Sequence, residues 1–176
     1  FSMGNCQQLN QLDVSANRLT GEIPGVVFML SSLSSGLNLS RNSFNGSLGN
    51  EIGNLTNLEL LDVSYNNLTG GIPASIGDCK TLKILFMQEN SLNGTIPEAM
   101  ASLQGIESLD LSRNHFTGGI PIGLQKVEAL KHLNLSFNDL QGEVPTKGIF
   151  RNSTGISLIG NTMLCGGVRN LNLQDC

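Results

Sequence analysis

Charged and aromatic residues are scarce in this 176-residue chain. Asp, Glu, Lys and Arg together make up 14% of the sequence, the formal net charge is −4, and there is no tryptophan and only one tyrosine. A chain with so few cations lacks the basic surface that nucleic acid binding requires. No run of about eighteen apolar residues is present, so we expect no membrane-spanning segment in this chain.

Patterns typical of metal sites and catalytic sites are also missing. The four cysteines form no Cys-x-x-Cys pair, and the two histidines, His115 and His132, are far apart in the sequence, so we expect no metal and no cofactor. Asp110 and Ser112 could be combined with a histidine into a triad, but nothing in the sequence places a nucleophile beside a base. We therefore predict that the chain is not an enzyme.

What the chain does contain is one short phrase repeated along its length. Seven asparagines recur at intervals of 25, 24, 24, 24, 24 and 23 residues, with apolar residues three and five positions before each and two positions after it. This is the L-x-x-L-x-L-x-x-N-x-L signature of leucine-rich repeats. The asparagines are Asn17, Asn42, Asn66, Asn90, Asn114, Asn138 and Asn161.

The repeat predicts a solenoid. Alternate residues of a short strand point to opposite faces, so the leucines of each repeat point inward, and neighbouring repeats must stack to bury them. The strands then form a parallel sheet on the concave face, with short 3-10 or helical turns on the convex face. Each asparagine is expected to turn inward and bond backbone groups. We expect one solenoid over 1–176, in which 1–8 is the tail end of a preceding repeat, 9–145 holds six repeats, and 146–176 is a degenerate repeat with a C-terminal cap.

Two departures from the repeat are visible. The phrase L-T-G-x-I-P follows most of the asparagines, but Gly49 stands where proline is expected, which predicts a looser turn there. The 25-residue interval places an insertion between Pro24 and Leu37.

The cysteines divide into two kinds. Cys165 and Cys176 lie eleven residues apart in the terminal segment, and we expect a disulfide that holds the cap, which indicates an oxidising, extracellular compartment; two free thiols are the alternative. Cys6 and Cys79 occupy equivalent places in their repeats, and we interpret both as buried free cysteines that act as small apolar residues. Cys6 could instead pair with a cysteine upstream of this chain.

Seven sequons for N-glycosylation favour the same compartment, although several arise from the repeat itself. Asn54 is expected on the convex side, whereas Asn38 and Asn134 lie between strand leucines on the concave face. The predicted sites are Asn38, Asn45, Asn54, Asn67, Asn93, Asn134 and Asn152.

The exposed residues of the strands and of the turns after them are the candidates for ligand or partner binding, since solenoids bind on the concave face and exposed aromatic and arginine side chains anchor interfaces. The alternative is a variable surface without a partner. One expected cluster, in the middle repeats, comprises Leu60, Tyr65, Ile84 and Phe86, and a second, nearer the C-terminus, comprises Arg113, His115, His132 and Phe137. The candidates are Leu60, Tyr65, Ile84, Phe86, Glu89, Arg113, His115, His132 and Phe137.

The phrase L-T-G-x-I-P resembles the plant-specific class of leucine-rich repeats. The segments Leu133–Phe150 and Ile156–Gly167 are similar to the last full repeat and the cap of plant immune receptor kinases, the group that includes the flagellin and elongation-factor-Tu receptors. The resemblance implies an α/β solenoid that forms the plant-type right-handed superhelix. It also implies that the chain is the C-terminal part of a cell-surface ectodomain, extracellular after secretion.

That family binds a peptide or protein ligand and a leucine-rich-repeat co-receptor that docks near the C-terminal repeats. By resemblance, Arg113, His115, His132, Phe137 and the cap are candidates for the co-receptor side, with a signalling role in immunity or development. Two other functions stay open. The chain could be a secreted inhibitor of a hydrolase, or it could self-associate through the apolar edge of its first repeat, which has no polar cap before Leu9.

Overall fold

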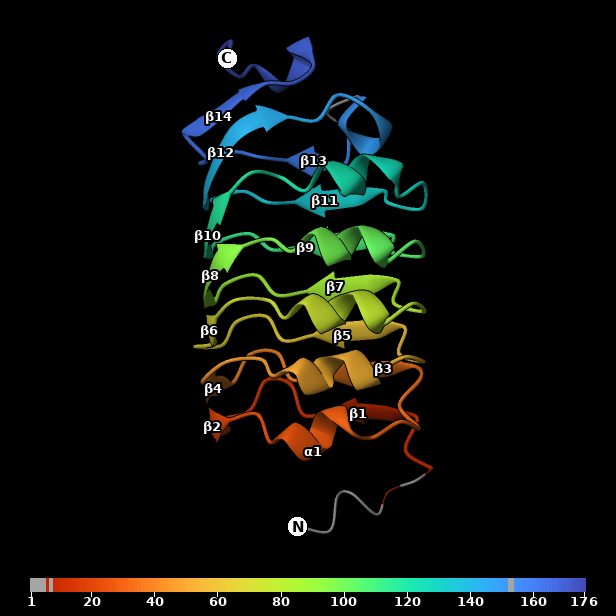
Figure 1. Ribbon diagram of the computed structural model, residues 1–176. Helices are drawn as coiled ribbons and strands as arrows, with labels where there is room; N and C mark the ends of the chain where they lie inside the picture. Colours follow the sequence, from red (N-terminus) through yellow and green to blue (C-terminus); the bar gives the residue numbers. More distant parts are fainter. Residues whose placement is uncertain (1–5, 7, 152–153) are drawn as a thin grey trace.

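The computed structural model describes residue 6, residues 8–151 and residues 154–176. The chain winds through successive turns that stack from the N-terminus to the C-terminus (Figure 1). Each turn contributes a strand to one long parallel sheet, which has the order β1-β3-β5-β7-β9-β11-β13. These strands are β1 (Gln11–Asp13), β3 (Gly36–Asn38), β5 (Leu60–Asp62), β7 (Ile84–Phe86), β9 (Ser108–Asp110), β11 (His132–Asn134) and β13 (Ile156–Ser157).

The register of this sheet follows the repeat. Leu61 pairs with Leu85 and Leu85 with Leu109, so equivalent leucines lie side by side in the interior. Their neighbours Leu60, Ile84 and Asp62 point to the other face and are half-buried. Alternation along three-residue strands therefore separates a core side from a solvent-accessible side, as the sequence predicts.

A second set of short strands follows the asparagines. It divides into a two-stranded sheet and a five-stranded sheet, which are joined by an isolated bridge between Ser47 and Thr69. The division falls in the repeat that carries Gly49, whose backbone is nevertheless extended, with φ −81° and ψ 167°. The two sheets comprise β2 (Thr20–Glu22) and β4 (Ser43–Asn45), then β6 (Thr69–Gly70), β8 (Ser91–Thr95), β10 (His115–Gly118), β12 (Asp139–Val144) and β14 (Met163–Gly166).

The opposite side of each turn is a single helical turn, drawn in front of the inner sheet in Figure 1. Most are 3-10 turns, and the exception is an α-helical turn in the repeat with the insertion. Within the described part of the chain, no helix is long and apolar enough to cross a membrane. The helical turns are α1 (Gly25–Phe28), η2 (Asn50–Asn54), η3 (Ala74–Asp78), η4 (Glu98–Ser102), η5 (Ile122–Lys126), η6 (Gly148–Arg151) and η7 (Arg169–Leu171).

One continuous apolar core fills the space between the sheet and the helical turns. Ile52, Ile76, Met100 and Leu124 project inward from η2 to η5 and are fully buried. The turns stack closely: a Cβ atom at the buried Gly77 would lie 2.7 Å from the carbonyl oxygen of Ala99 in the next turn, which excludes larger side chains there. The fold class predicted from the sequence is confirmed.

The buried asparagines form a hydrogen-bonded ladder beside this core. Asn114 donates from Nδ2 to the carbonyl oxygens of Leu111 (3.2 Å) and of Met87 (3.0 Å) in the preceding turn, and its Oδ1 accepts from the N–H of Leu92 (3.0 Å). Each such amide therefore bonds its own turn to the preceding one. Asn17 is the exception: it is exposed, and its Nδ2 donates only within its own turn.

The cysteines agree with the sequence in three of four positions. Cys165 and Cys176 form a disulfide, which joins β14 to the C-terminal tail. Cys79 is buried, and its thiol donates to the carbonyl oxygen of Ile52. The prediction of a buried Cys6 is wrong: Cys6 is exposed. It lies at the N-terminal end of the solenoid, where no described repeat stacks over it.

The two free thiols should differ sharply in reactivity. Burial, with a smaller contribution from Asp78, raises the pKa of Cys79 to about 11, and the thiolate is the reactive form. We expect iodoacetamide at pH 8 to modify Cys6 within minutes and to leave Cys79 unmodified in the folded protein, as measured by peptide mass spectrometry. The unfolded protein, in which both cysteines react, is the control, and equal rates in the folded state would contradict the structure.

Candidate ligand-binding surface

The outward residues of the inner sheet form the floor of the surface. Leu60 and Ile84 are register neighbours on β5 and β7, and Asp62, Phe86 and Asp110 form the adjacent row. Parallel strands lie about 4.8 Å apart, so the side chains of neighbours in a row are in contact range. Three members of the predicted middle cluster, Leu60, Ile84 and Phe86, therefore come together.

A second row stands at the end of the strands, at the position before each asparagine. These six residues all have left-handed backbones, with φ between 53° and 57°, although none is glycine. A left-handed conformation costs roughly 1–2 kcal/mol for a residue with a Cβ atom, and it persists because the buried asparagine ladder fixes the turn. The row consists of Ala16, Arg41, Tyr65, Glu89, Arg113 and Phe137.

Side chains in this left-handed row contact one another from turn to turn. The guanidinium of Arg41 lies 4.3 Å from the ring centroid of Tyr65, and that of Arg113 lies 4.5 Å from the ring of Phe137. Arg113 Nε also lies 3.2 Å from a carboxylate oxygen of Glu89. Glu89, Arg113 and Phe137 therefore form one line of contacts, whereas Tyr65 packs under Arg41 and lies in a different row from Phe86.

The two histidines lie on different sheets. His132 is the first residue of β11 on the inner sheet, and His115 is the first residue of β10 on the second sheet. Both are exposed. The predicted C-terminal group is therefore not one cluster: Arg113 and Phe137 form a stack, and the histidines stand on separate surfaces.

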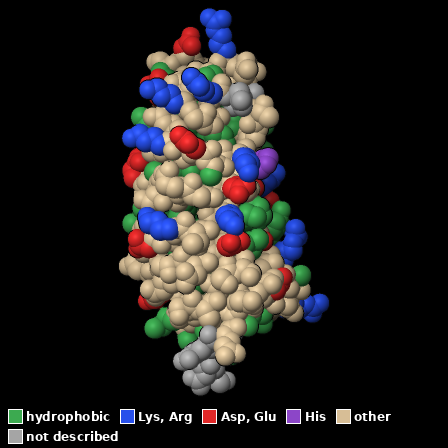
Figure 2. Space-filling model, turned by 90° about the vertical axis from the view of Figure 1, so that its right-hand side faces the viewer, with side chains coloured by type: hydrophobic (Ala, Val, Ile, Leu, Met, Phe, Trp, Pro, Cys, Tyr) green, Lys and Arg blue, Asp and Glu red, His purple; other side chains and the backbone are tan. Residues whose placement is uncertain are grey.

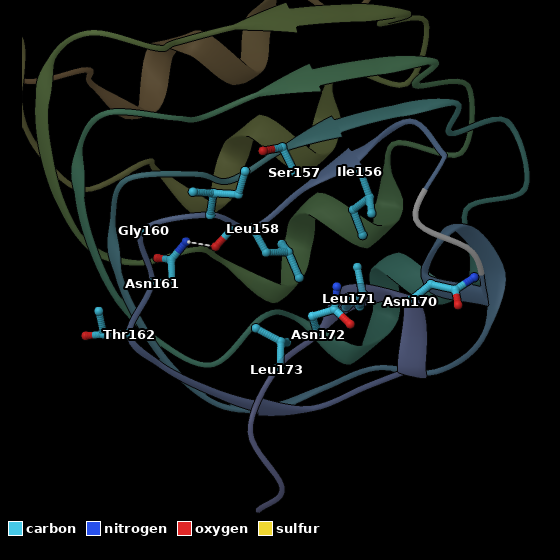
Figure 3. Close-up of a pocket in the computed structure, with 11 residues that line it drawn as sticks. Ile156, Ser157, Leu158, Gly160, Asn161, Thr162, Asn170, Leu171, Asn172 and Leu173 are labelled. Atoms are coloured by element: carbon cyan, nitrogen blue, oxygen red, sulfur yellow. Dashed lines mark hydrogen bonds between the residues drawn. The ribbon is translucent and has the colours of Figure 1, made fainter.

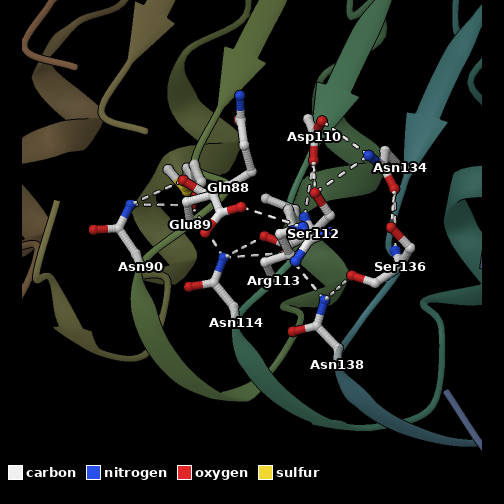
Figure 4. A network of polar contacts seen from close by, with 12 residues as sticks. Gln88, Glu89, Asn90, Asp110, Ser112, Arg113, Asn114, Asn134, Ser136 and Asn138 are labelled. Carbon is white, nitrogen blue, oxygen red and sulfur yellow. Dashed lines mark hydrogen bonds and ion pairs between the residues drawn. The ribbon is translucent and has the colours of Figure 1, made fainter. Parts of the chain in front are cut away.

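Asp110 and Ser112 belong to a structural pair that recurs along the sheet. The Ser112 hydroxyl is buried and donates to Asp110 Oδ1 (2.6 Å), which also accepts from the Ser112 N–H (2.9 Å) (Figure 4). Asp62 holds Ser64 in the same way. The residues of these pairs are half-buried or buried, and one carboxylate oxygen of each aspartate is used to hold the framework. Among the described residues, no group of three or more His, Cys, Asp or Glu side chains is placed to hold a metal ion.

Four of the predicted glycosylation sites are exposed: Asn45 on β4, Asn54 at the end of η2, Asn67, and Asn93 on β8. Their occupancy stays a prediction. Asn38 and Asn134 use their amide groups in the framework instead. Asn134 Nδ2 donates to Asp110 Oδ2 (3.0 Å), and its Oδ1 accepts from the Ser136 hydroxyl (2.6 Å). Asn152 lies outside the described residues.

Two further ion pairs recur along the solenoid. Lys83 contacts Glu59 at 2.9 Å, and Lys131 contacts Glu107, in equivalent places two turns apart. The Lys131 ammonium lowers the pKa of the Glu107 carboxyl through its hydrogen bond. Figure 2 shows charged side chains of both signs interspersed over one face of the molecule, with hydrophobic side chains gathered beside them along the right-hand edge. The surface thus has no strong charge of one sign.

Two shallow hollows open on this part of the molecule. One, of about 410 Å³, crosses the inner sheet from Phe86 past Asp110 and His132 to Ile156. The other, of about 440 Å³, lies at the C-terminal end, between β13 and the tail residues Leu171 and Leu173 (Figure 3). The first hollow meets the predicted middle cluster at Phe86 and runs from there toward the C-terminus.

A parallel inner sheet, 3-10 turns and a buried asparagine ladder define the chain as a leucine-rich-repeat solenoid. A family model for the leucine rich repeat matches residues 56–116 and 80–140, and a second one matches residues 8–30. Over 70% of its length the chain resembles the ectodomain of the receptor kinase SOBIR1 from Arabidopsis thaliana, with 30% identity, a TM-score of 0.65 and 68% of that ectodomain covered. The chain belongs to the family of leucine-rich-repeat ectodomains of plant receptor kinases.

Two further relatives are similar over shorter shares of their own length. The Arabidopsis receptor kinase HAESA, solved in complex with the peptide hormone IDA and the co-receptor SERK1, has a TM-score of 0.85 and 34% identity over 94% of this chain. The LRR receptor-like serine/threonine-protein kinase EFR from Arabidopsis thaliana is 55% identical over 31 residues, which are 18% of this chain. This chain spans 27% of the HAESA chain, and the EFR match spans 3% of that protein.

Proposed function

We propose that this chain is part of an extracellular recognition domain that binds a peptide or protein ligand on its concave face. The observation that carries the proposal is that each turn has one set of residues that holds the fold and another that stays accessible. The leucines and asparagines are buried and bonded, while Leu60, Ile84 and Phe86 remain accessible on rigid strands. Rigid strands present side chains with little loss of entropy on binding, which favours recognition. The peptide hormone in the HAESA complex supports the same class of ligand.

The co-receptor is proposed to dock at the C-terminal repeats, for a signalling role in immunity or development at the cell surface. The stack of Arg113 on Phe137 supports this place, because Phe137 is 46% exposed and arginine and aromatic side chains are frequent interface anchors. The co-receptor SERK1 in the HAESA complex supports the class of partner.

This proposal is tested by binding to an immobilised SERK1 ectodomain, measured by biolayer interferometry with the secreted chain. We expect Phe137→Ala and Arg113→Ala each to weaken binding by about tenfold or more, which is the loss of one interface anchor. Tyr65→Ala and Arg41→Ala are matched controls, since they remove the same kind of stack three turns away. Equal effects of both pairs, or no effect of either, would contradict docking at the C-terminal repeats.

Self-association is a second candidate, supported by the N-terminal edge. Among the described residues, β1 has a neighbour on one side only, and Leu19 at this edge is 41% exposed, whereas the equivalent Leu68 is 1% exposed. An apolar edge with unpaired strand groups favours stacking on another chain. Sedimentation equilibrium measures this directly: a monomer at the highest soluble concentration would rule it out.

A further inference from the structure

Among the first six turns, one departs from the other five at two positions that are coupled in space. In the five turns headed by Asp13, Asn38, Asp62, Asp110 and Asn134, this residue accepts a hydrogen bond from the N–H of a serine two positions later. In the turn between Asp62 and Asp110, both members of the pair are replaced, by Phe86 and Gln88. The side-chain oxygen of Gln88 is buried and has no hydrogen-bond partner among the described residues.

Among the described residues, the structure shows no contact through which the replacement of this pair by Phe86 and Gln88 stabilises the fold. A buried polar atom without a partner costs on the order of 1–3 kcal/mol, whereas the Asp–Ser and Asn–Ser pairs are fully bonded. Local rules that are broken without a compensating contact are most often found at functional sites. The Phe86 turn is therefore a place to look for a ligand contact.

The exchange also leaves one carboxylate oxygen available. Asp13 Oδ2 accepts from the amide of Asn38 (3.2 Å), and Asp110 Oδ2 accepts from the amide of Asn134 (3.0 Å), in each case from the equivalent residue of the next turn. The equivalent residue next to Asp62 is Phe86, whose ring has no donor. Asp62 therefore has one oxygen bonded to Ser64 and a second oxygen without a partner among the described residues.

Asp62 and Phe86 together suit a cation. A guanidinium group can stack on an aromatic ring and donate to a carboxylate at the same time. The spacing permits it: twice in this chain an arginine lies 4.3 to 4.5 Å from the ring one turn further along. The three cations nearest to Asp62 in sequence have other partners: Lys80 donates to the carbonyl oxygen of Gly77, Lys83 pairs with Glu59, and Arg41 stacks on Tyr65. None of the described cations is therefore paired with Asp62.

We propose that Asp62 and Phe86 form a subsite for an arginine side chain of an extended peptide ligand, with an apolar ligand residue packed on Leu60 and Ile84. Arginine is the occupant that fits both groups, because its guanidinium can donate to the Asp62 carboxylate and stack on the Phe86 ring. The hollow from Phe86 to Ile156 provides a path for the rest of the peptide toward the C-terminal repeats. This subsite rests on the proposed function, since it names the class of peptide that the concave face binds.

Three substitutions isolate the subsite. Asp62→Asn removes the charge and keeps the fold, because Asn38 and Asn134 hold their serines in the same way. Phe86→Asn places an amide where Asn38 and Asn134 carry theirs, so the donor fills the free oxygen of Asp62. Asp13→Asn is the matched control, in the same row but distant from the ring. Circular dichroism and thermal unfolding verify that each variant is folded.

The experiment is selection from a random dodecapeptide display library against the purified secreted chain, followed by affinity measurements on synthetic copies of the enriched peptides. We expect peptides with arginine next to an apolar residue. Their affinity should fall about tenfold or more with Asp62→Asn, with Phe86→Asn, and when citrulline replaces the arginine, as expected for a lost charge-assisted hydrogen bond. Asp13→Asn should leave the affinity unchanged.

The outcomes separate the two proposals. Enriched peptides that contain no basic residue, or that bind Asp62→Asn as well as the original chain, would overturn the subsite and leave peptide binding standing. A library that yields no binder to the folded chain would count against peptide recognition by this chain, and the subsite would fall with it.

Discussion

Replacing Asn114 by alanine should destabilise the protein by about 3–5 kcal/mol, because several buried backbone groups lose their partner at once. Asn114 bonds the carbonyl oxygens of Met87, Leu111 and Ser112 and the N–H of Leu92, all within 3.2 Å. For a chain of this size the expected fall in the melting temperature is about 10 °C. Thermal unfolding followed by circular dichroism measures it.

Asn17→Ala is the matched control for this substitution. Asn17 is exposed and donates only to Val14 and Ser15 of its own turn, so its loss should cost less than about 1 kcal/mol. If both substitutions cost the same, the ladder would not be a bond between turns, and the coupling of repeats would rest on the leucines alone.

Phe116→Ala should have an effect of similar size through a different mechanism. The Phe116 ring is fully buried beside the second sheet, and its removal leaves a cavity that neighbouring turns cannot close. Loss of a buried phenylalanine costs about 3–5 kcal/mol. In urea unfolding monitored by circular dichroism, the urea concentration at the midpoint should be far lower than that of the original chain.

Phe137→Ala provides the contrast, because it deletes the same ring from an exposed position. The Arg113 guanidinium over that ring contributes about 0.5–1 kcal/mol, so stability should change little while co-receptor binding falls. A large loss of stability with Phe137→Ala would mean that the left-handed row is part of the framework and not a binding surface.

The repeat made most of the framework predictable. The spacing of Leu61, Leu85 and Leu109 fixes which residues face the core, since each must meet its equivalent in the next turn. Asn114 was predictable because it recurs at the same place in each repeat and its amide carries both donors and an acceptor for the backbone groups of the turn. The disulfide between Cys165 and Cys176 followed from two cysteines near the end of the chain.

Features that depend on contacts between turns were harder to predict from the sequence. Cys6 has the sequence position of Cys79, but a position buries a side chain only where another repeat covers it, and none of the described residues covers Cys6. The left-handed turns carry arginine, tyrosine, glutamate and phenylalanine, and none of these residue types indicates positive φ. Tyr65 packs against Arg41 and not with Leu60, Ile84 and Phe86, which depends on side-chain direction and not on spacing.

The significance of Phe86 also needed the structure. The sequence identifies Phe86 as an exposed aromatic residue in the middle repeats. The hydrogen bonds of Asp13 and Asp110 to the asparagines of the next turn show what Phe86 displaces, and hence why Asp62 differs from them. The division of the chain at 9–145 and 146–176, and the binding roles of the candidate residues, stay predictions.

Hydrogen–deuterium exchange with and without an enriched peptide tests most directly whether the concave face is the recognition surface. Binding should slow exchange in β5, β7 and β9 and in the left-handed turns after them, and it should leave the convex turns η2 to η5 unchanged. Protection confined to the convex turns, with none in the inner sheet, would contradict the account.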